Sequence, residues 1–153
     1  MVRSGALRQL RRRLRRLADR ATVRLHAWNS LGARGERAAG RLLRRKGWTI
    51  IGRQVRLPHG ELDLVAVDGE TVVFVEVKTR RGEERGRPDE AVGPAKQRKL
   101  TALAVAYLRR HELLDQPARF DVIAVHWPSG ARRPQLQHFR DAFEARGAQS
   151  MYA

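Results

Sequence analysis

The sequence predicts an α/β fold in which helices flank a mixed central β-sheet, with the elements in the order helix, three strands, helix, strand. Three observations indicate this fold. Residues 60–80 read as two strands around the turn Asp68-Gly69, residues 93–111 carry a helical pattern, and residues 119–127 form an apolar, strand-like run. The hairpin is antiparallel, whereas a helix between two strands is typical of a parallel crossover. The sheet is therefore expected to be mixed.

The composition fits one domain without a membrane span. The chain has 153 residues, 42% of them hydrophobic, which is enough for one core. Its apolar runs fall far short of the ~18 residues that cross a bilayer, and its N-terminus lacks the apolar segment of a secretory signal. The absence of cysteine excludes disulfides and thiolate metal sites and fits a cytosolic protein. We therefore expect a cytoplasmic protein with no transmembrane segment.

The charge is strongly positive, at +16 from 32 basic and 16 acidic residues, and nine of the arginines lie in residues 1–24. Residues 1–27 are read as a basic N-terminal extension, helical or disordered. A helix here would carry an apolar stripe of Leu7, Leu10, Leu14, Leu17 and Ala21. Three interpretations stay open: a solvated or disordered segment, a basic helix that follows phosphates, and a helix lying at a membrane surface.

Residues 30–46 are predicted to form the next helix, because Ser30 is a suitable N-cap and Gly47 fits the position after the helix end. Glu36 lies in the first half of this helix. It either leans toward a site or pairs with Arg34 or Arg41. Residues 48–57 follow as a strand at or near the edge of the sheet; Trp48 is expected in the core and Pro58 ends the strand.

The hairpin carries charged residues inside apolar strands. If Asp68-Gly69 is a two-residue loop, Glu61 lies opposite Glu76, and Asp63 is a diagonal neighbour of Glu76. Strand alternation then places these three carboxylates and Lys78 on one face.

A bound divalent cation would resolve this concentration of negative charge. Like charges opposite one another are destabilising, and carboxylate oxygens are the ligands that Mg²⁺ prefers. Lys78 would supply positive charge for a phosphate or an attacking water. The alternative is an ion pair of Lys78 with Glu76 or Glu61 on a solvated face. The apolar neighbours of these residues favour the metal site.

Two short sequence segments around these residues resemble those of a known family. Asp63, twelve intervening residues and Glu76-Val77-Lys78 resemble the Asp…(Asp/Glu)-x-Lys signature of the restriction-endonuclease-like, or PD-(D/E)xK, superfamily. Residues 60–66 (Gly-Glu-Leu-Asp-Leu-Val-Ala) and 74–80 (Phe-Val-Glu-Val-Lys-Thr-Arg) strongly resemble the YraN family, an uncharacterised bacterial group described as endonuclease-like. The likeness extends to residues 31–36 and 119–122 and covers roughly residues 28–127, which we take as the nuclease-like domain.

The resemblance implies a restriction-endonuclease-like core and a metal-dependent active site. Asp63 and Glu76 would bind Mg²⁺ or Mn²⁺, and Lys78 would complete the catalytic set. Glu61 and Glu36 are accessory acidic candidates, since an acid on the first helix can lean toward the metal in related nucleases.

The remaining candidates lie after the hairpin. Residues 79–88 are predicted to form a mobile loop, in which Thr79 and Arg80 contact phosphate. Lys96 and Gln97, at the start of the helix at 93–111, are further candidate substrate contacts. Asp121 is expected to cap or to pair with Arg119. Residues 128–153 are read as a C-terminal tail with a short helical segment that includes Leu136, Phe139 and Phe143.

The sequence thus predicts a Mg²⁺-dependent endonuclease that hydrolyses DNA phosphodiester bonds, with branched or nicked DNA as the substrate. A cutter of both strands would need two sites and hence a homodimer. The alternative is a non-catalytic nucleic-acid-binding adaptor that keeps the nuclease fold. Neither a phosphate-binding Gly-x-x-x-x-Gly-Lys-[Ser/Thr] loop nor a Gly-x-Gly-x-x-Gly fingerprint occurs in the sequence.

Overall fold

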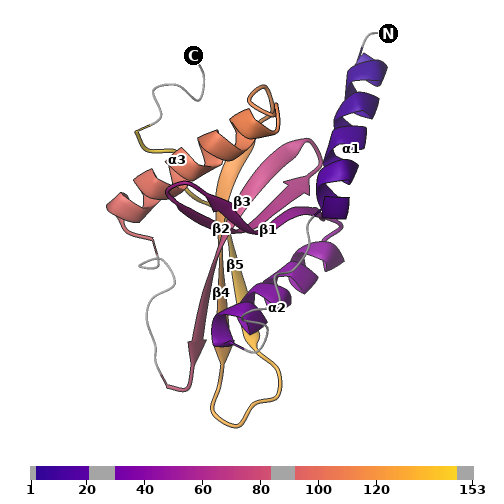
Figure 1. Ribbon diagram of the computed structural model, residues 1–153. Helices are drawn as coiled ribbons and strands as arrows, with labels where there is room; N and C mark the ends of the chain where they lie inside the picture. Colours follow the sequence, from indigo (N-terminus) through magenta and orange to yellow (C-terminus); the bar gives the residue numbers. More distant parts are fainter. Residues whose placement is uncertain (1–2, 21–29, 84–91, 148–153) are drawn as a thin grey trace.

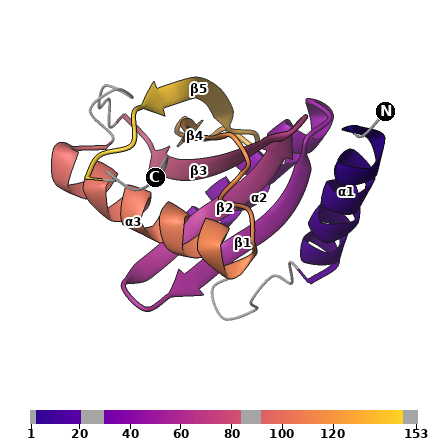
Figure 2. The ribbon, with the colours of Figure 1, turned by 90° about the horizontal axis from the view of Figure 1, so that it is seen from above.

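A five-stranded mixed sheet forms the centre of the protein and carries helices on both faces (Figures 1 and 2). The structure is a computed structural model and describes residues 3–20, 30–83 and 92–147. Its elements are α1 (Arg3–Arg20), α2 (Leu31–Arg45), β1 (Thr49–Leu57), β2 (Gly60–Asp68), β3 (Thr71–Arg81), α3 (Pro94–Arg110), β4 (Ala118–Trp127) and β5 (Gln135–Phe143).

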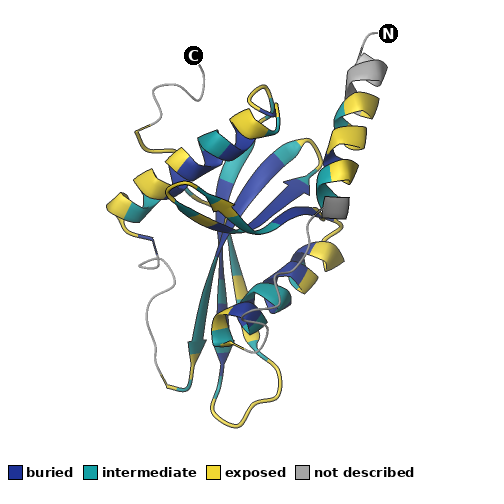
Figure 3. Ribbon diagram, in the orientation of Figure 1, coloured by how far each residue is buried: buried dark blue, intermediate teal, exposed yellow. Residues whose placement is uncertain are grey.

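The strands follow one another in the sheet in chain order, from β1 to β5. β3 and β4 are parallel and are joined through α3, whereas the other neighbouring pairs are antiparallel. A mixed sheet flanked by helices confirms the predicted fold class and matches a restriction-endonuclease-like core. Figure 3 shows the buried residues gathered in the strands and on the inward sides of the helices.

Two apolar clusters hold these layers together. On one face α3 packs through Leu103, Ala104 and Tyr107 against strand residues such as Phe74 and Phe120. On the other face α2 packs through Ala38, Ala39 and Leu43 against Val73, Val75 and Ile123. Because every strand residue points to one face or the other, the long apolar runs of β3 and β4 supply both clusters. Those runs therefore lie in the middle of the sheet.

The predicted helix ends are confirmed for α2. The Ser30 hydroxyl accepts a hydrogen bond from the Ala33 amide at 3.1 Å, and Gly47 adopts a φ of 85° directly after the C-cap. Both features satisfy backbone groups that a helix end leaves unpaired. The helix predicted at 93–111 is also confirmed as α3, with Pro94 in its first turn.

Two predictions for the segments outside the core are corrected. The C-terminal segment around Phe139 is not helical: it forms strand β5, which pairs with β4. β3 continues to Arg81, so Thr79 and Arg80 belong to a strand and not to the predicted loop. Residues 84–88 of that loop lie outside the described residues.

The N-terminal arginine-rich segment is a helix, α1, packed beside β1. Leu14 is buried, and Leu10, Leu17 and Ala18 pack against the same apolar cluster as α3. The disordered interpretation is therefore wrong for residues 3–20. Within the described residues, no helix is long and apolar enough to cross a membrane.

Gly35 provides a sharp test of how closely α2 approaches β3. A Cβ atom built on Gly35 would lie 1.8 Å from the Thr79 hydroxyl oxygen and 2.9 Å from the Thr79 Cβ, so rotating the threonine side chain does not remove the clash. We expect Gly35→Ala to destabilise the protein by about 1–3 kcal/mol. A Cβ on Gly32 of the same helix meets no atom within 4 Å. Gly32→Ala should therefore be neutral or stabilising by up to about 1 kcal/mol, and equal effects in urea denaturation would contradict the close approach.

Candidate active site at the fork of the sheet

The sheet divides in the middle, and the candidate acids lie where it divides. β2 pairs with β3 only from Asp68 opposite Thr71 to Leu64 opposite Val75. Beyond this point β2 continues alongside β1 as far as Gly60, and β3 continues alongside β4 as far as Arg81. Asp63 and Glu76 are the first residues past the last β2–β3 pair, one on each branch of the fork.

The register of the hairpin differs from the prediction by two residues. Asp68 pairs with Thr71, so the two-residue loop is Gly69-Glu70 and not Asp68-Gly69. Continuing this register by one residue sets Asp63 beside Glu76, where the prediction had Glu61. Because the shift is even, each side chain keeps its predicted face.

The side chain of Asp63 takes the place of a backbone carbonyl of β2 as a hydrogen-bond acceptor for β3. Its Oδ2 accepts a hydrogen bond of 2.8 Å from the amide of Val77, on the side of β3 that β2 has left. The carboxylate is thereby fixed next to Glu76, and the amide of Val77 stays satisfied in a part-buried place.

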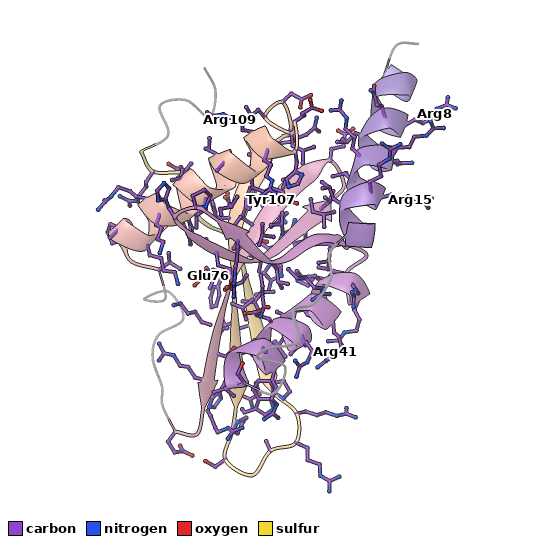
Figure 4. The ribbon with its side chains drawn as sticks, viewed as in Figure 1. Arg8, Arg15, Arg41, Glu76, Tyr107 and Arg109 are labelled. Atoms are coloured by element: carbon purple, nitrogen blue, oxygen red, sulfur yellow. The ribbon has the colours of Figure 1, made fainter. Side chains whose placement is uncertain are left out.

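Glu76 is a buried carboxylate held by two lysines. Its side chain is only 7% exposed, and its Oε1 lies 3.6 Å from the Nζ of Lys78 on the same strand. The Nζ of Lys96, from the first turn of α3, donates a hydrogen bond to the same oxygen. Figure 4 shows Glu76 at the centre of the molecule, below α3. The site therefore combines two carboxylates with two ammonium groups.

Burial and repulsion disfavour the charged form of Asp63. Its pKa is raised from 3.8 to about 7, chiefly by burial and then by the negative charge of Glu76, against which the Val77 hydrogen bond acts only in part. A cation bound beside Asp63 would stabilise its ionised form. The site is therefore suited to bind a cation.

The two lysines respond differently to the site. The pKa of Lys78 is lowered by burial and by the neighbouring ammonium of Lys96. Burial also acts to lower the pKa of Lys96, but its hydrogen bond to Glu76 and the charge of that carboxylate raise the pKa overall. Lys96 is thus the closer counter-ion of Glu76, and Lys78 is the more readily deprotonated of the two.

The two accessory acids take different places. Glu36 on α2 has a raised pKa, mainly through burial, and the charges of Glu61 and Glu76 contribute to the rise. Its side chain hydrogen-bonds to Gln54, so it leans toward the fork and does not pair with Arg34 or Arg41. Glu61 forms an exposed ion pair of 3.2 Å with Arg56 across the β1–β2 hairpin, which leaves it at the margin of the site.

The donor set fits a magnesium or manganese ion. Within the described residues no three His, Cys, Asp or Glu side chains cluster as metal ligands, but Mg²⁺ in phosphoryl-transfer sites commonly takes only one or two carboxylates and completes its shell with water and phosphate. Asp63 and Glu76 supply two such hard ligands. Burial and then the charge of Glu76 raise the pKa of Asp63, and a divalent cation beside the two carboxylates would offset both effects.

The predicted substrate contacts are only partly brought to the site. Lys96 reaches it, and Arg80 shares the face of Glu76 and Lys78 through strand alternation. Thr79 does not: it lies on the opposite face, with its hydroxyl buried against Gly35 of α2. The Gln97 side chain donates to the Val92 carbonyl and accepts from Arg146, so it is engaged in holding the start of α3.

Asp121 pairs with Arg119, as predicted, and it belongs to a network separate from Glu76 and its lysines. Its Oδ1 accepts hydrogen bonds from Arg119 Nε at 3.0 Å and from the Asp141 amide at 2.9 Å, and its Oδ2 accepts one from His138 Nε2 at 2.8 Å. The sequence predicted a short helical segment in this region, so neither Asp141 nor His138 was expected here. Pairing of β5 with β4 is what brings them to Asp121.

Comparison with known proteins gives a consistent family. A sequence model described as "Uncharacterised protein family UPF0102" matches residues 35–125. A UPF0102 protein of Geotalea uraniireducens is 46% identical over 115 residues, covering 75% of this chain and 90% of the relative. A UPF0102 protein of Symbiobacterium thermophilum is 49% identical over 116 residues, covering 75% and 97% of the two chains. These names state the family and no activity. The matched region contains the whole fork.

Proposed function

Since the chain is a member of the UPF0102 (YraN) family, with its endonuclease-like fold, we propose that it is a metal-dependent endonuclease that hydrolyses DNA phosphodiester bonds in the cytoplasm. The observation that carries the proposal is the pair Asp63 and Glu76 at the fork, with Lys78 3.6 Å from Glu76. This set supplies hard oxygen ligands and a neighbouring ammonium, which are the groups that metal-assisted phosphodiester hydrolysis requires.

The chain's own residues have distinct tasks in this reaction. Asp63 and Glu76 would hold Mg²⁺ or Mn²⁺, which would lower the pKa of a water molecule and stabilise negative charge on the phosphate. Lys78 donates a hydrogen bond to the attacking water or to a non-bridging phosphate oxygen. Glu36, which senses the charge of Glu76, would be a further acid beside this pair. Burial and the neighbouring ammonium of Lys96 lower the pKa of Lys78, which suits a group that exchanges a proton with water.

Lys96 has a second task. Its ammonium pairs with Glu76, and a cation bound by Glu76 would repel it. Released from Glu76, its ammonium would lie at the start of α3, where backbone amides also favour an anion. Lys96 therefore binds the scissile phosphate, in agreement with its predicted role as a substrate contact.

The test is a panel of labelled linear, nicked, flapped and four-way DNA, incubated with the full chain in Mg²⁺, Mn²⁺ or EDTA. Glu76→Gln removes one ligand charge, and Glu70→Gln is the matched control, because Glu70 is an exposed acid in the loop of the same hairpin. We expect cleavage by the wild type and by Glu70→Gln in metal only, strongest on branched or nicked DNA, and none by Glu76→Gln. Cleavage that Glu76→Gln retains would contradict the proposal.

A non-catalytic adaptor is the second candidate. The observation in its favour is that Lys96 and Lys78 both pair with Glu76 and so balance its charge. An adaptor would bind the same DNA panel but leave it intact in both metals.

Cutting both strands at one place would require two forks, and hence two copies of the chain. Sedimentation of the protein with DNA therefore tests the proposed homodimer.

A further inference from the structure

The outer face of α1 carries an array of arginines. Four of them, Arg11, Arg12, Arg15 and Arg16, are exposed, and we call them the arginine face. Within the described residues none of the four has an ion pair with an acid. Arg8 and Arg15 point outward from the molecule in Figure 4, away from the sheet and from Glu76. This charge is therefore presented to a partner outside the chain.

The opposite face of the same helix is fixed to the domain. Leu10, Leu14 and Leu17 pack on the apolar cluster beside β1. Arg13 donates a hydrogen bond to the carbonyl of Glu112 and lies 3.7 Å from its carboxylate, which ties α1 to the end of α3. The arginine face is thus held in one orientation, and binding through it does not first require the helix to fold.

The spacing of the arginines makes them repel one another. Arg11 and Arg15, like Arg12 and Arg16, are four residues apart and therefore neighbours on the helix surface, where like charges are destabilising. The described part of α1 carries one acid, Asp19, beside its eight arginines. A polyanion bound along the helix would relieve this repulsion.

Three polyanions compete for such a surface, and the packing discriminates between them. An amphipathic helix enters a membrane surface through its apolar face, but the leucines of α1 are already packed on the domain. Single-stranded nucleic acid is usually held by stacking on aromatic side chains, and α1 has none. A duplex backbone needs only positive charges at fixed spacing, and a helix of 18 residues offers them along about 27 Å.

We propose that the arginine face of α1 is a second docking surface for the phosphate backbone of duplex DNA, separate from the fork. It rests on the proposed function for the identity of the nucleic acid. Because the arginine face points away from Glu76, it would hold a duplex arm other than the one at the fork. A four-way or flapped DNA has such an arm, and a short linear duplex has none. The family model covers residues 35–125, so α1 lies outside the region that defines the family.

The experiment measures binding of the full chain to a labelled four-way DNA and to a short linear duplex in EDTA, from 50 to 300 mM NaCl. The test variant replaces the arginine face by glutamine (Arg11→Gln, Arg12→Gln, Arg15→Gln and Arg16→Gln), which has a similar helix propensity. Each lost phosphate contact makes the slope of log K against log salt shallower by about 0.9, so four contacts amount to about 3.6. We expect the slope for four-way DNA to become shallower by about 2–4 and the affinity at 100 mM salt to fall at least about tenfold.

Two controls separate docking from net charge. The first removes four exposed arginines elsewhere (Arg109→Gln, Arg110→Gln, Arg132→Gln and Arg133→Gln) and should change the slope by less than about 1. The second replaces the arginine face by lysines and should retain the wild-type slope. Thermal denaturation of every variant checks that the packed leucine side of α1 is intact.

The outcomes distinguish this inference from the proposed nuclease. A slope that does not change, or that changes equally in the first control, overturns the docking surface even if the wild type cleaves DNA. A shallower slope in a protein that cleaves nothing supports the docking surface and contradicts the nuclease. Loss of binding to phosphatidylserine vesicles in the test variant, with DNA binding unchanged, would identify a membrane surface instead and overturn the inference.

Discussion

Asp63→Asn is expected to make the metal-free protein more stable at pH 8 and to remove its DNA cleavage. Asp63 has a pKa of about 7 in the folded protein, whereas an unfolded aspartate ionises near 3.9. From about pH 4 to 7 the folded state therefore binds the proton more tightly than the unfolded state. Over this window the free energy of unfolding of the wild type falls as the pH rises, by up to about 4 kcal/mol.

Asparagine removes this loss because it does not ionise, while its amide oxygen can still accept the Val77 hydrogen bond. Urea denaturation in EDTA should show the variant above the wild type at pH 8 and close to it at pH 4. Mn²⁺ should stabilise the wild type and not the variant, because only the wild type binds it well. DNA cleavage should fall by more than the roughly 100-fold that disturbing the outer shell of a metal site costs.

Asp115→Asn is the matched control, since Asp115 is exposed beyond the end of α3. It should leave both stability and cleavage unchanged. If Asp63→Asn is less stable than the wild type at pH 8, the ionised Asp63 carboxylate stabilises the fold. This result would contradict the proposal that Asp63 is a cation ligand whose charge destabilises the protein when no cation is bound.

The second large effect has the opposite sign. Asp121→Asn is expected to destabilise the protein at pH 7 by about 3–5 kcal/mol, the usual cost of breaking a buried ion pair. Asp121 is 0% exposed and receives donors from Arg119, His138 and the Asp141 amide. An asparagine would remove one of the two carboxylates that pair with Arg119, leaving Asp68, and would turn an amide NH₂ toward groups that donate to the present carboxylate.

The pH dependence of Asp121→Asn separates the two aspartates. Burial alone would raise the pKa of Asp121, but hydrogen bonds from His138 and Arg119 outweigh it and hold the pKa below its usual range. This stabilisation is present above pH ~4 and is lost as the pH falls through the folded-state value. The variant should therefore approach the wild type progressively as the pH falls below about 4. Asp141→Asn, which keeps the left-handed conformation of Asp141 (φ 50°), should be neutral.

The hairpin shows what could be read from the sequence and what could not. Asp68-Gly69 and Gly69-Glu70 are both plausible central pairs of a two-residue loop, because glycine supports either turn type. Gly69 has a φ of 62° and occupies the first central position. Choosing between the two needed the cross-strand packing of the whole sheet. The site prediction kept its faces because the two registers differ by two residues.

β5 was missed for a different reason. Leu136, Phe139 and Phe143 are spaced by three and four residues, which is the pattern of a helix. In the structure Leu136 packs on the α2 side of the sheet, and Phe139 and Phe143 pack on the α3 side. A strand with apolar residues on both faces can imitate helical spacing. The choice between helix and strand depends on pairing with β4, which is not visible in the local sequence of this segment.

Thr79 illustrates the limit of motif reading. It follows Lys78 directly, so the sequence placed it beside the catalytic candidates, but strand alternation turns it to α2. Glu36 shows a different limit: two interpretations were open, and its hydrogen bond to Gln54, a residue with a φ of 44°, was not among them. No local sequence pattern predicts the left-handed conformation of Gln54.

The position of α1 also bears on how the protein avoids association with itself. β1 is an edge strand of the sheet, and an uncovered edge offers its free amides and carbonyls to strands of other molecules. α1 lies against this strand (Figure 2) and covers it with leucines while it turns positive charge outward. Deleting α1 would therefore expose both an apolar surface and a pairing edge. Aggregation, and not only loss of affinity for DNA, is the expected fate of a chain shortened at that end.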